Sequence, residues 1–133
     1  MEQKAERQDH ILRAALELFL RHGYKKTSMD DVARAAGLTR QGLYFHYHGK
    51  DELLRRSVEH ALDRGREAVE RALAEGGPPE ERLWAVLDAW FGGYVGLFTP
   101  ELVPDWELHC RRLVGERVAA DNAWFRCRLA EAL

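Results

Sequence analysis

Long hydrophobic runs are missing from this sequence. No stretch of 18 or more apolar residues, the length that marks a candidate transmembrane helix, occurs in the chain. Nor does it open with a charged segment followed by an apolar one, as a secretory signal does. The composition, 46% hydrophobic and 32% charged, is typical of a soluble globular protein. We therefore expect a cytoplasmic protein without a membrane partner.

Cysteine is scarce, and no group of residues has the spacing of a metal or catalytic site. Cys110 and Cys127 either pack as small hydrophobic side chains or form a disulfide with each other. His109 beside Cys110 gives adjacent ligands and a distant third, which favours packing over zinc binding. The chain has no Ser/His/Asp set, no Gly-rich phosphate loop after a strand and no clustered carboxylate pair. The sequence therefore predicts a protein that is not an enzyme and binds no metal or cofactor.

A large net charge is also missing, since the formal charge is −2. The charges are unevenly distributed along the chain, however. Residues 1–56 carry eleven Lys and Arg against eight Asp and Glu, a balance of +3, and residues 57–133 carry nine against fourteen, a balance of −5. A basic segment of this kind is typical of nucleic-acid binding, although an excess of three charges is weak evidence by itself.

The stretch 27–47, TSMDDVARAAGLTRQGLYFHY, has the pattern of two short helices joined by a tight turn. Ser28, followed three residues later by Asp31, is a weak capping box at a helix start. Gly37 lies where that helix ends most easily, because glycine tolerates the positive φ of a helix exit. Thr39 can then cap a second helix that begins at residue 40. This arrangement is the helix-turn-helix of DNA-binding proteins.

The second helix of this pair has the composition of a DNA-reading helix. Leu43 and Tyr47 lie four residues apart and can anchor it to a core. The residues left on its outer face are Arg40, Gln41, Tyr44, Phe45 and His46. Two exposed aromatic rings beside Arg, Gln and His suit a surface that meets phosphates and base edges.

Around this motif the chain resembles the tetracycline-repressor (TetR) family of bacterial transcription regulators. That family has a first helix ending in Gly-aromatic, a Thr-rich helix start, Ala-x-x-Ala-Gly-Val/Leu-Ser/Thr, and Leu-Tyr-x-x-Phe-x-x-Lys-x-x-Leu. The matching residues here are Gly23-Tyr24, Thr27-Ser28, Ala33 to Thr39, and Leu43-Tyr44 through Tyr47, Lys50 and Leu53. The match covers residues 8–56 and is specific, because many residue types recur at fixed offsets.

The resemblance implies a ligand-responsive transcription regulator, usually a repressor, that binds a palindromic double-stranded DNA operator as a homodimer. It also implies a small-molecule effector. We expect Lys50 and the free amides of the helix turn that it opens to hold a phosphate. The candidate DNA-binding residues are Thr27, Ser28, Thr39, Arg40, Gln41, Gly42, Tyr44, Phe45, His46 and Lys50.

Two residues depart from the family pattern. Gly42 replaces the usual Thr or Ser of the second motif helix, which removes a hydroxyl that could reach DNA and costs about 1 kcal/mol of helix propensity. Gly49 replaces the common Ser before the next helix, at a cost of a few tenths of a kcal/mol. The alternative hypothesis is therefore a helical binding or interaction module of the same fold that has lost operator binding.

Apolar stripes and breaks predict the remaining helices. We expect residues 1–7 to be a frayed arm and residues 8–22 to form the first helix. A stripe predicts a further helix over residues 50–75, which the sequence GGPP then ends. Residues 105–133 are expected to form one or two helices with a break near Gly115.

Residues 80–98 form a second informative stretch. From Leu83 to Phe98 the only charged residue is Asp88, which predicts a helix buried on all sides and too short to span a bilayer. Its glycines allow either close helix packing or space for a ligand. In the second case Asp88 would be a polar anchor for an amphipathic or cationic small molecule. The candidate ligand-binding residues are Trp84, Asp88, Trp90, Phe91, Tyr94, Phe98, Trp106 and His109.

The last residues keep an amphipathic pattern without an evident partner in the chain. Apolar or long side chains recur three and four apart at Trp124, Phe125, Arg128, Leu129 and Leu133. Soluble monomers rarely leave such a stripe open, so we expect residues from 116 onward to pair with a second copy. Family members are usually longer than 133 residues, so the resemblance also implies a fragment or a shortened member.

The sequence therefore predicts an all-α protein. A three-helix helix-turn-helix DNA-binding head covers residues 1–50, and an incomplete helical ligand-binding and dimerisation bundle covers residues 51–133.

Overall fold

The computed structural model describes residues 2–94, 96–97 and 99–132. Within these ranges the regular structure is helical throughout, which confirms the all-α class. The elements are α1 (Glu2–His22), α2 (Met29–Ala36), α3 (Arg40–His46), α4 (Lys50–Glu75), α5 (Pro79–Phe91), the 3-10 helix η1 (Pro100–Leu102) and α6 (Val103–Ala132). None of the helices in the described part of the chain combines the length and apolar composition needed to cross a bilayer.

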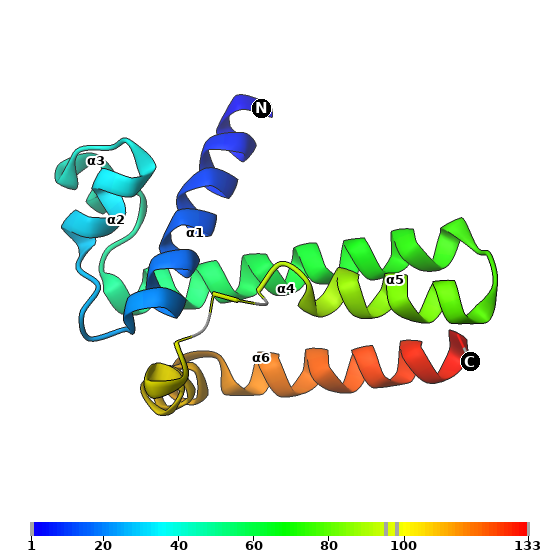
Figure 1. The fold of residues 1–133 in the computed structure, drawn as a ribbon. Coiled ribbons are helices and arrows are strands. Elements are labelled where there is room, and N and C mark those ends of the chain that lie inside the picture. Colours follow the sequence, from blue (N-terminus) through cyan, green and yellow to red (C-terminus); the bar gives the residue numbers. More distant parts are fainter. Residues whose placement is uncertain (1, 95, 98, 133) are drawn as a thin grey trace.

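The helices form two parts, which we call the head and the arm. In Figure 1, α1, α2 and α3 gather at one end of the molecule, and α4 begins beside them and runs to the opposite end. Helix α5 returns along α4, and the second part of α6 runs alongside this pair. The head comprises α1–α3 with the first turns of α4, and the arm comprises the rest of α4 with α5 and α6.

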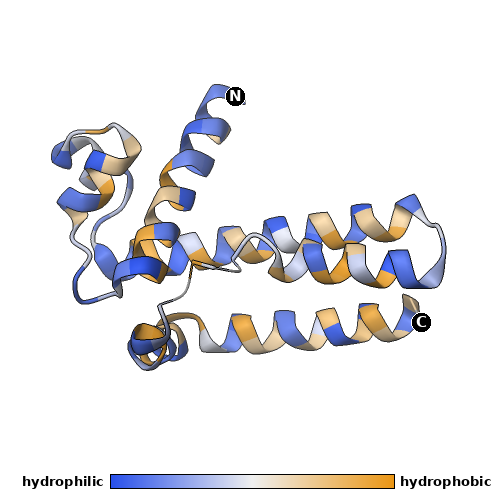
Figure 2. Ribbon diagram, viewed as in Figure 1, coloured by the Kyte–Doolittle hydropathy of each residue, from blue (hydrophilic) through white to orange (hydrophobic). Residues whose placement is uncertain are grey.

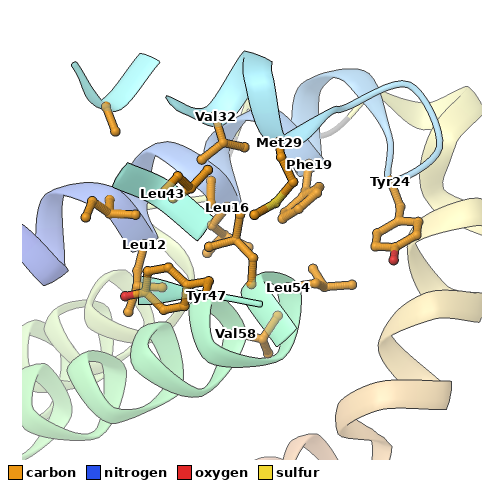
Figure 3. Packing of buried hydrophobic residues seen from close by; sticks show 14 of the residues in the cluster. Leu12, Leu16, Phe19, Tyr24, Met29, Val32, Leu43, Tyr47, Leu54 and Val58 are labelled. Carbon is orange, nitrogen blue, oxygen red and sulfur yellow. The ribbon is translucent and has the colours of Figure 1, made fainter. Parts of the chain in front are cut away.

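The head is built around one face of α1. Its buried residues recur at helical spacing: Ile11, Leu12, Ala15, Leu16, Phe19 and Leu20. Side chains from α2, α3 and α4 meet this face, among them Val32, Leu43 and Leu54 (Figure 3). Fully burying one such side chain contributes about 1.5–3 kcal/mol. This shared core therefore fixes α3 on the head.

The expected cap chemistry is present at both motif helices. The Ser28 hydroxyl accepts a hydrogen bond from the Asp31 amide at 3.1 Å, and the Asp31 carboxylate accepts one from the Ser28 amide at 2.9 Å. Gly37 ends α2 with a φ of 73°, which other residues adopt only at a cost. Thr39 caps α3 by accepting a hydrogen bond from the Gly42 amide at 3.0 Å. The structure thus contains the predicted helix-turn-helix.

A second core holds the arm together. It consists of Val69 and Ala72 from α4, Val86 and Trp90 from α5, and Phe125 from α6. The rings of Trp90 and Phe125 are stacked, with centroids 4.8 Å apart and planes 6° apart. All three helices of the arm therefore contribute to one apolar contact.

A buried ionic contact also joins α4 to α6. The side chain of Asp121 is 1% exposed, and it accepts two hydrogen bonds from Arg66 and one from Arg117, at 2.9–3.2 Å. Burial raises the pKa of this carboxyl, but the bonds from Arg66 and Arg117 outweigh burial and hold the pKa below its ordinary value. A buried charge compensated in this way ties the two helices in one register.

The ends of the predicted helices agree with the structure in some places and differ in others. Helix α4 has the predicted bounds, and the break near Gly115 is confirmed by the non-helical Val114 (φ −138°, ψ 18°). The frayed N-terminal segment predicted for residues 1–7 is wrong for residues 2–7, which belong to α1. Their Glu, Gln, Lys, Ala and Arg are strong helix formers, and polarity alone does not stop a helix.

The stretch 80–98 is not a helix buried on all sides. Helix α5 ends at Phe91, and within α5 only Val86 and Trp90 are buried. Trp84 and Phe91 are 66% and 51% exposed, and Asp88 is exposed as well. Figure 2 shows hydrophobic and hydrophilic segments alternating along α5. The reason is that α5 packs on α4 and α6 with one face and leaves the other open.

The C-terminal stripe has a partner within the chain, so the expectation that it lacks one is wrong, whereas pairing of residues from 116 onward with a second copy stays a prediction. Phe125 is buried in the arm core, and Trp124 packs against that core. Arg128 donates two hydrogen bonds of 2.8 Å to Glu70 on α4. Helices α4 and α5 thus take up the face that the sequence left unassigned. Leu133 lies outside the described residues.

Candidate functional site

Helix α3 presents its outer face to solvent. Leu43 is fully buried and Tyr47 nearly so, and both hold α3 on the core as expected. The outward residues are Arg40, Gln41, Tyr44, Phe45 and His46, all of them exposed. Among the described residues Phe45 has the most exposed aromatic ring, at 83%, and it is not part of the head core. Its position supports contact with a partner.

Arg40 is held loosely at the start of this face. Its guanidinium lies 3.6 Å from the Asp30 carboxylate and 5.6 Å from the centre of the Tyr44 ring. Both members of the ion pair are about half exposed or more, and such pairs contribute little to stability. Arg40 can therefore exchange Asp30 for a base edge or a phosphate at small cost.

The start of α4 lies at the other border of the head. No side chain caps its first turn at Gly49, so backbone amides there are open to an anion. The Lys50 ammonium donates a hydrogen bond of 2.7 Å to the Tyr24 carbonyl and lies 4.2 Å from the Tyr24 ring centre. Burial lowers the pKa of Lys50, although Asp105 and Asp51 oppose this. Lys50 thus has one structural bond and two further N–H groups for a phosphate.

The hydroxyls of the candidate set mostly serve the fold. Thr27 is 2% exposed, and its hydroxyl donates to the Gly23 carbonyl at 2.8 Å, so the structure places it in the head core and away from the outer face. Ser28 and Thr39 are exposed but act as helix caps. At Gly42, an added Cβ would lie only 3.1 Å from the Thr39 hydroxyl, so glycine there leaves the cap undisturbed.

A polar cluster joins the head to α6. The Asp51 carboxylate accepts a hydrogen bond from the Tyr24 hydroxyl and two of 3.1 Å from Arg112. The His109 ring stacks on the Tyr24 ring, with centroids 4.1 Å apart. The Asp105 carboxylate accepts a hydrogen bond of 2.9 Å from the Tyr24 backbone amide. His109, expected in a ligand pocket, therefore belongs to this contact instead.

The pKa values of the cluster reflect these bonds. Hydrogen bonds from Arg112 and Tyr24 lower the pKa of Asp51 to about 2. Burial, together with the bond to Asp51, raises the pKa of Tyr24 to about 12. At neutral pH the cluster therefore joins an ionised Asp51 to a neutral Tyr24.

An apolar cavity of about 320 Å³ lies between head and arm. Its volume is at the lower end of small-molecule sites, which span roughly 300–1,000 Å³. It is lined by Leu16, Leu20, Val58, Ala61, Leu62, Gly65, Trp90, Phe91, Tyr94, Trp106 and Asn122. Helix α1 of the head and helices α4, α5 and α6 all contribute to this lining.

The structure brings together half of the predicted ligand-binding residues. Four of the eight line the cavity: Trp90, Phe91, Tyr94 and Trp106. Trp84 and Asp88 are exposed on α5 outside its lining, and Phe98 lies outside the described residues. The polar anchor at Asp88 is therefore wrong, and with it the argument for a cationic ligand.

Sequence reasoning missed the α1 and α4 side of the cavity. Ala61 and Gly65 lie four residues apart on α4, where small side chains leave room, and a Cβ on Gly65 would come within 3.2 Å of the Trp90 ring. Two small residues one turn apart on an otherwise bulky stripe were the available signal. Their partner Trp90 is supplied by a different helix, which the stripe alone does not reveal.

Neither cysteine forms a disulfide, and no cluster of metal ligands occurs among the described residues. Cys110 is half-buried, and burial raises the pKa of its thiol to about 12. Cys110 thus packs as a small hydrophobic side chain, whereas Cys127 is exposed.

Comparison with known proteins identifies the family. The profile of the bacterial regulatory proteins of the tetR family matches residues 11–56, which contain α2, α3 and the cap residues described above. The head of this chain, residues 11–56, belongs to the TetR family. A curated TetR-type relative, the HTH-type transcriptional regulator YfiR of Bacillus subtilis, is 32% identical over 89 residues, which cover 67% of this chain and 41% of YfiR.

Solved structures of TetR-family regulators share the fold beyond the head. PfmR of Thermus thermophilus is 32% identical, with a TM-score of 0.57 over 92% of this chain and 65% of PfmR. A regulator from Marinobacter aquaeolei, at 24% identity, superposes with a TM-score of 0.64 over 99% of this chain and 68% of the other. This chain spans less than half the length of the curated relatives that it matches. These relatives are transcription regulators and not enzymes.

Proposed function

We propose that this chain is a ligand-responsive repressor that binds a palindromic DNA operator as a homodimer in the cytoplasm. Residues 1–50 form the DNA-binding domain, and residues 51–133 belong to the ligand-binding and dimerisation domain. The observation that carries the proposal is the outer face of α3, which the core anchors Leu43 and Tyr47 hold in a fixed orientation. A fixed helix with Arg, Gln and open aromatic rings at its surface is suited to a DNA groove.

The residues divide into two roles on DNA. Arg40 and Gln41 open α3, and the first residues of a recognition helix normally reach base edges. Tyr44, Lys50 and the amides of the first α4 turn are placed to hold phosphates, which set position but not sequence. One head covers one half-site, so a palindrome with half-sites about one helical turn apart requires two copies.

The cavity provides the response to a ligand. Its lining includes Leu16 and Leu20 from the head and Trp90 from the arm. A molecule seated there contacts both parts and favours one setting of α4 between them. If that setting fits the operator less well, the ligand lowers DNA affinity, and operator must lower ligand affinity by the same factor.

The test begins by selecting the DNA fragments that the 133-residue chain retains from a random pool. We expect an enriched palindrome. Arg40→Ala should then relax discrimination at one base position by about 1–3 kcal/mol, whereas Lys50→Ala should weaken all sequences alike and lower the salt slope by about 1. Arg126→Ala, at an exposed position on α6, is the control.

Two results would contradict the proposal. Retention of no sequence above background would favour the alternative, a helical interaction module without operator binding. Equal loss of specific and random DNA on Arg40→Ala would remove the base-reading role from Arg40.

A further inference from the structure

The apolar cavity adjoins a second hollow with a different lining. This neighbouring groove has a volume of about 670 Å³ and runs between α1, α4 and the segment after α5. Leu16, Ala61, Gly65 and Tyr94 line both spaces, so the cavity and the groove share a boundary. A molecule longer than the cavity would extend into the groove.

Guanidinium groups dominate the charge of the groove. Arg13, Arg64 and Arg71 line it. Arg13 and Arg64 share a single carboxylate, Asp9, at 3.8 and 2.6 Å, and Arg71 makes no ion pair with a described residue. Glu67 is the one lining carboxylate in the described part of the chain that is not paired elsewhere.

The remaining groups do not reverse this balance. Glu17, which also lines the groove, lies 3.1 Å from Arg21. His60 faces the groove and bonds Asp9 at 2.7 Å, so a proton on His60 would add positive charge. The groove is therefore positive, whereas no acidic side chain lines the apolar cavity among the described residues.

Tyr94 marks the boundary between the two spaces. Tyr94 lines the groove together with Arg13 and Arg64. Burial raises the pKa of its hydroxyl, and the charges of the two guanidiniums oppose this. Within the described part of the chain no hydrogen bond uses the Tyr94 hydroxyl. It is thus an available donor next to two cations.

We propose that the ligand of this site is an amphipathic anion, with its apolar tail in the cavity and its anionic head group against Tyr94, Arg64 and Arg13. The proposal rests on the ligand site of the proposed function and names the class of molecule that it takes. A cation would meet guanidiniums where the cavity opens into the groove, and a wholly apolar molecule would leave the Tyr94 donor without an acceptor.

Three probes with a chain of ten carbons test the ligand class: decanoate, decanol and decyltrimethylammonium, each below its micelle concentration. Binding to the full chain without DNA is followed by calorimetry and by tryptophan fluorescence, since two of the four tryptophans, Trp90 and Trp106, line the cavity. We expect decanoate to bind about threefold to tenfold more tightly than decanol, as a charge-assisted contact would give. Decyltrimethylammonium should bind most weakly.

Variants locate the head group. Arg64→Gln and Tyr94→Phe should bring decanoate towards the affinity of decanol and leave decanol unchanged, and Arg64→Lys should restore part of the preference. Arg55→Gln is the matched control, because Arg55 is a similarly exposed arginine on the same helix, paired with Glu59 and outside the groove. Thermal melting establishes that each variant is folded.

The outcomes separate this inference from the proposed function. Equal affinity for decanoate and decanol would overturn the anion class and leave the ligand cavity standing. Failure of all three probes to bind would overturn both the ligand class and the cavity as a ligand site. DNA selection measures operator binding independently. If it enriches no operator, the measured preference for decanoate still stands.

Discussion

Thr27 illustrates, at the scale of a single residue, a hydroxyl that belongs to the fold and not to the outer surface. We expect Thr27→Val to destabilise the protein by about 1–3 kcal/mol, because it leaves the buried Gly23 carbonyl without its hydrogen bond. Urea unfolding measures this change, and Thr27→Ser is the control that keeps the hydroxyl. Loss of operator affinity at unchanged stability would instead make Thr27 a DNA contact.

Asp51 accounts for part of the folding stability that is lost at acid pH. Its pKa is about 2 in the folded chain against an ordinary 3.8, so the unfolded chain binds more protons between these values. The stabilisation from Asp51 is complete above about pH 4 and is lost as the pH falls through about 2. We expect Asp51→Asn to be less stable than the wild type at neutral pH, with the difference vanishing towards pH 2.

Denaturant unfolding at a series of pH values checks this expectation. Arg112→Gln is the companion variant, because Arg112 is the main cause of the lowered pKa. Like Asp51→Asn, Arg112→Gln should reduce the part of the stability that is lost as the pH falls from about 4 to about 2. A difference between wild type and Asp51→Asn that stays constant from neutral pH to about pH 2 would exclude this origin.

Two aspartates show what single residues do not reveal from sequence. Asp88 stands alone in an apolar stretch and was the natural candidate for burial, yet it is exposed. The buried carboxylate is Asp121, and one of its partners, Arg66, lies 55 residues away in the sequence. Which carboxylate is buried depends on whether a guanidinium can reach it, and that is decided by the packing of α4 on α6.

At the scale of elements, locally determined features were predicted well. The bounds of α2 and α4 follow from the Ser28 cap, from Gly37 and from the glycines after residue 75, all of which act within one helix turn. The partners that cover the apolar faces of α5 and α6 were predicted poorly. An apolar stripe indicates that a helix face is covered but not which element covers it. The cavity combines both cases, since Trp90 and Tyr94 were foreseen and Ala61 and Gly65 were not.

The stacking of α6 on α5 leads to a prediction for the arm. Phe125→Ala removes the ring that stacks on Trp90 and should cost about 3–5 kcal/mol. Because Trp90 also lines the ligand cavity, the variant should weaken decanoate as well. Thermal melting and tryptophan fluorescence measure the two effects, and Leu108→Ala, at an exposed side chain of α6 outside the cavity lining, is the milder comparison. A fully stable Phe125→Ala would show that the arm core contributes little.

At the scale of the whole molecule, the presence of one head per chain leads to an expectation about the number of chains on DNA. We expect two chains on a palindrome and one on an isolated half-site, measured by light scattering of the DNA complexes. Trp124→Glu should lower stability rather than separate the two copies, because Trp124 packs within its own chain. A single chain bound to the full palindrome at undiminished affinity would exclude the homodimer.

The unbroken course of α4 from head to arm sets a scale for regulation. Its 26 residues make a rod about 39 Å long, so a tilt of about 5° about the Gly76 end displaces the Lys50 end by about 3 Å. One base-pair step of DNA measures about 3.4 Å. The cavity contacts α4 between Val58 and Gly65, about midway along this rod. A ligand that displaces α4 there by about 2 Å is therefore enough to shift the two heads of a dimer out of phase with the double helix.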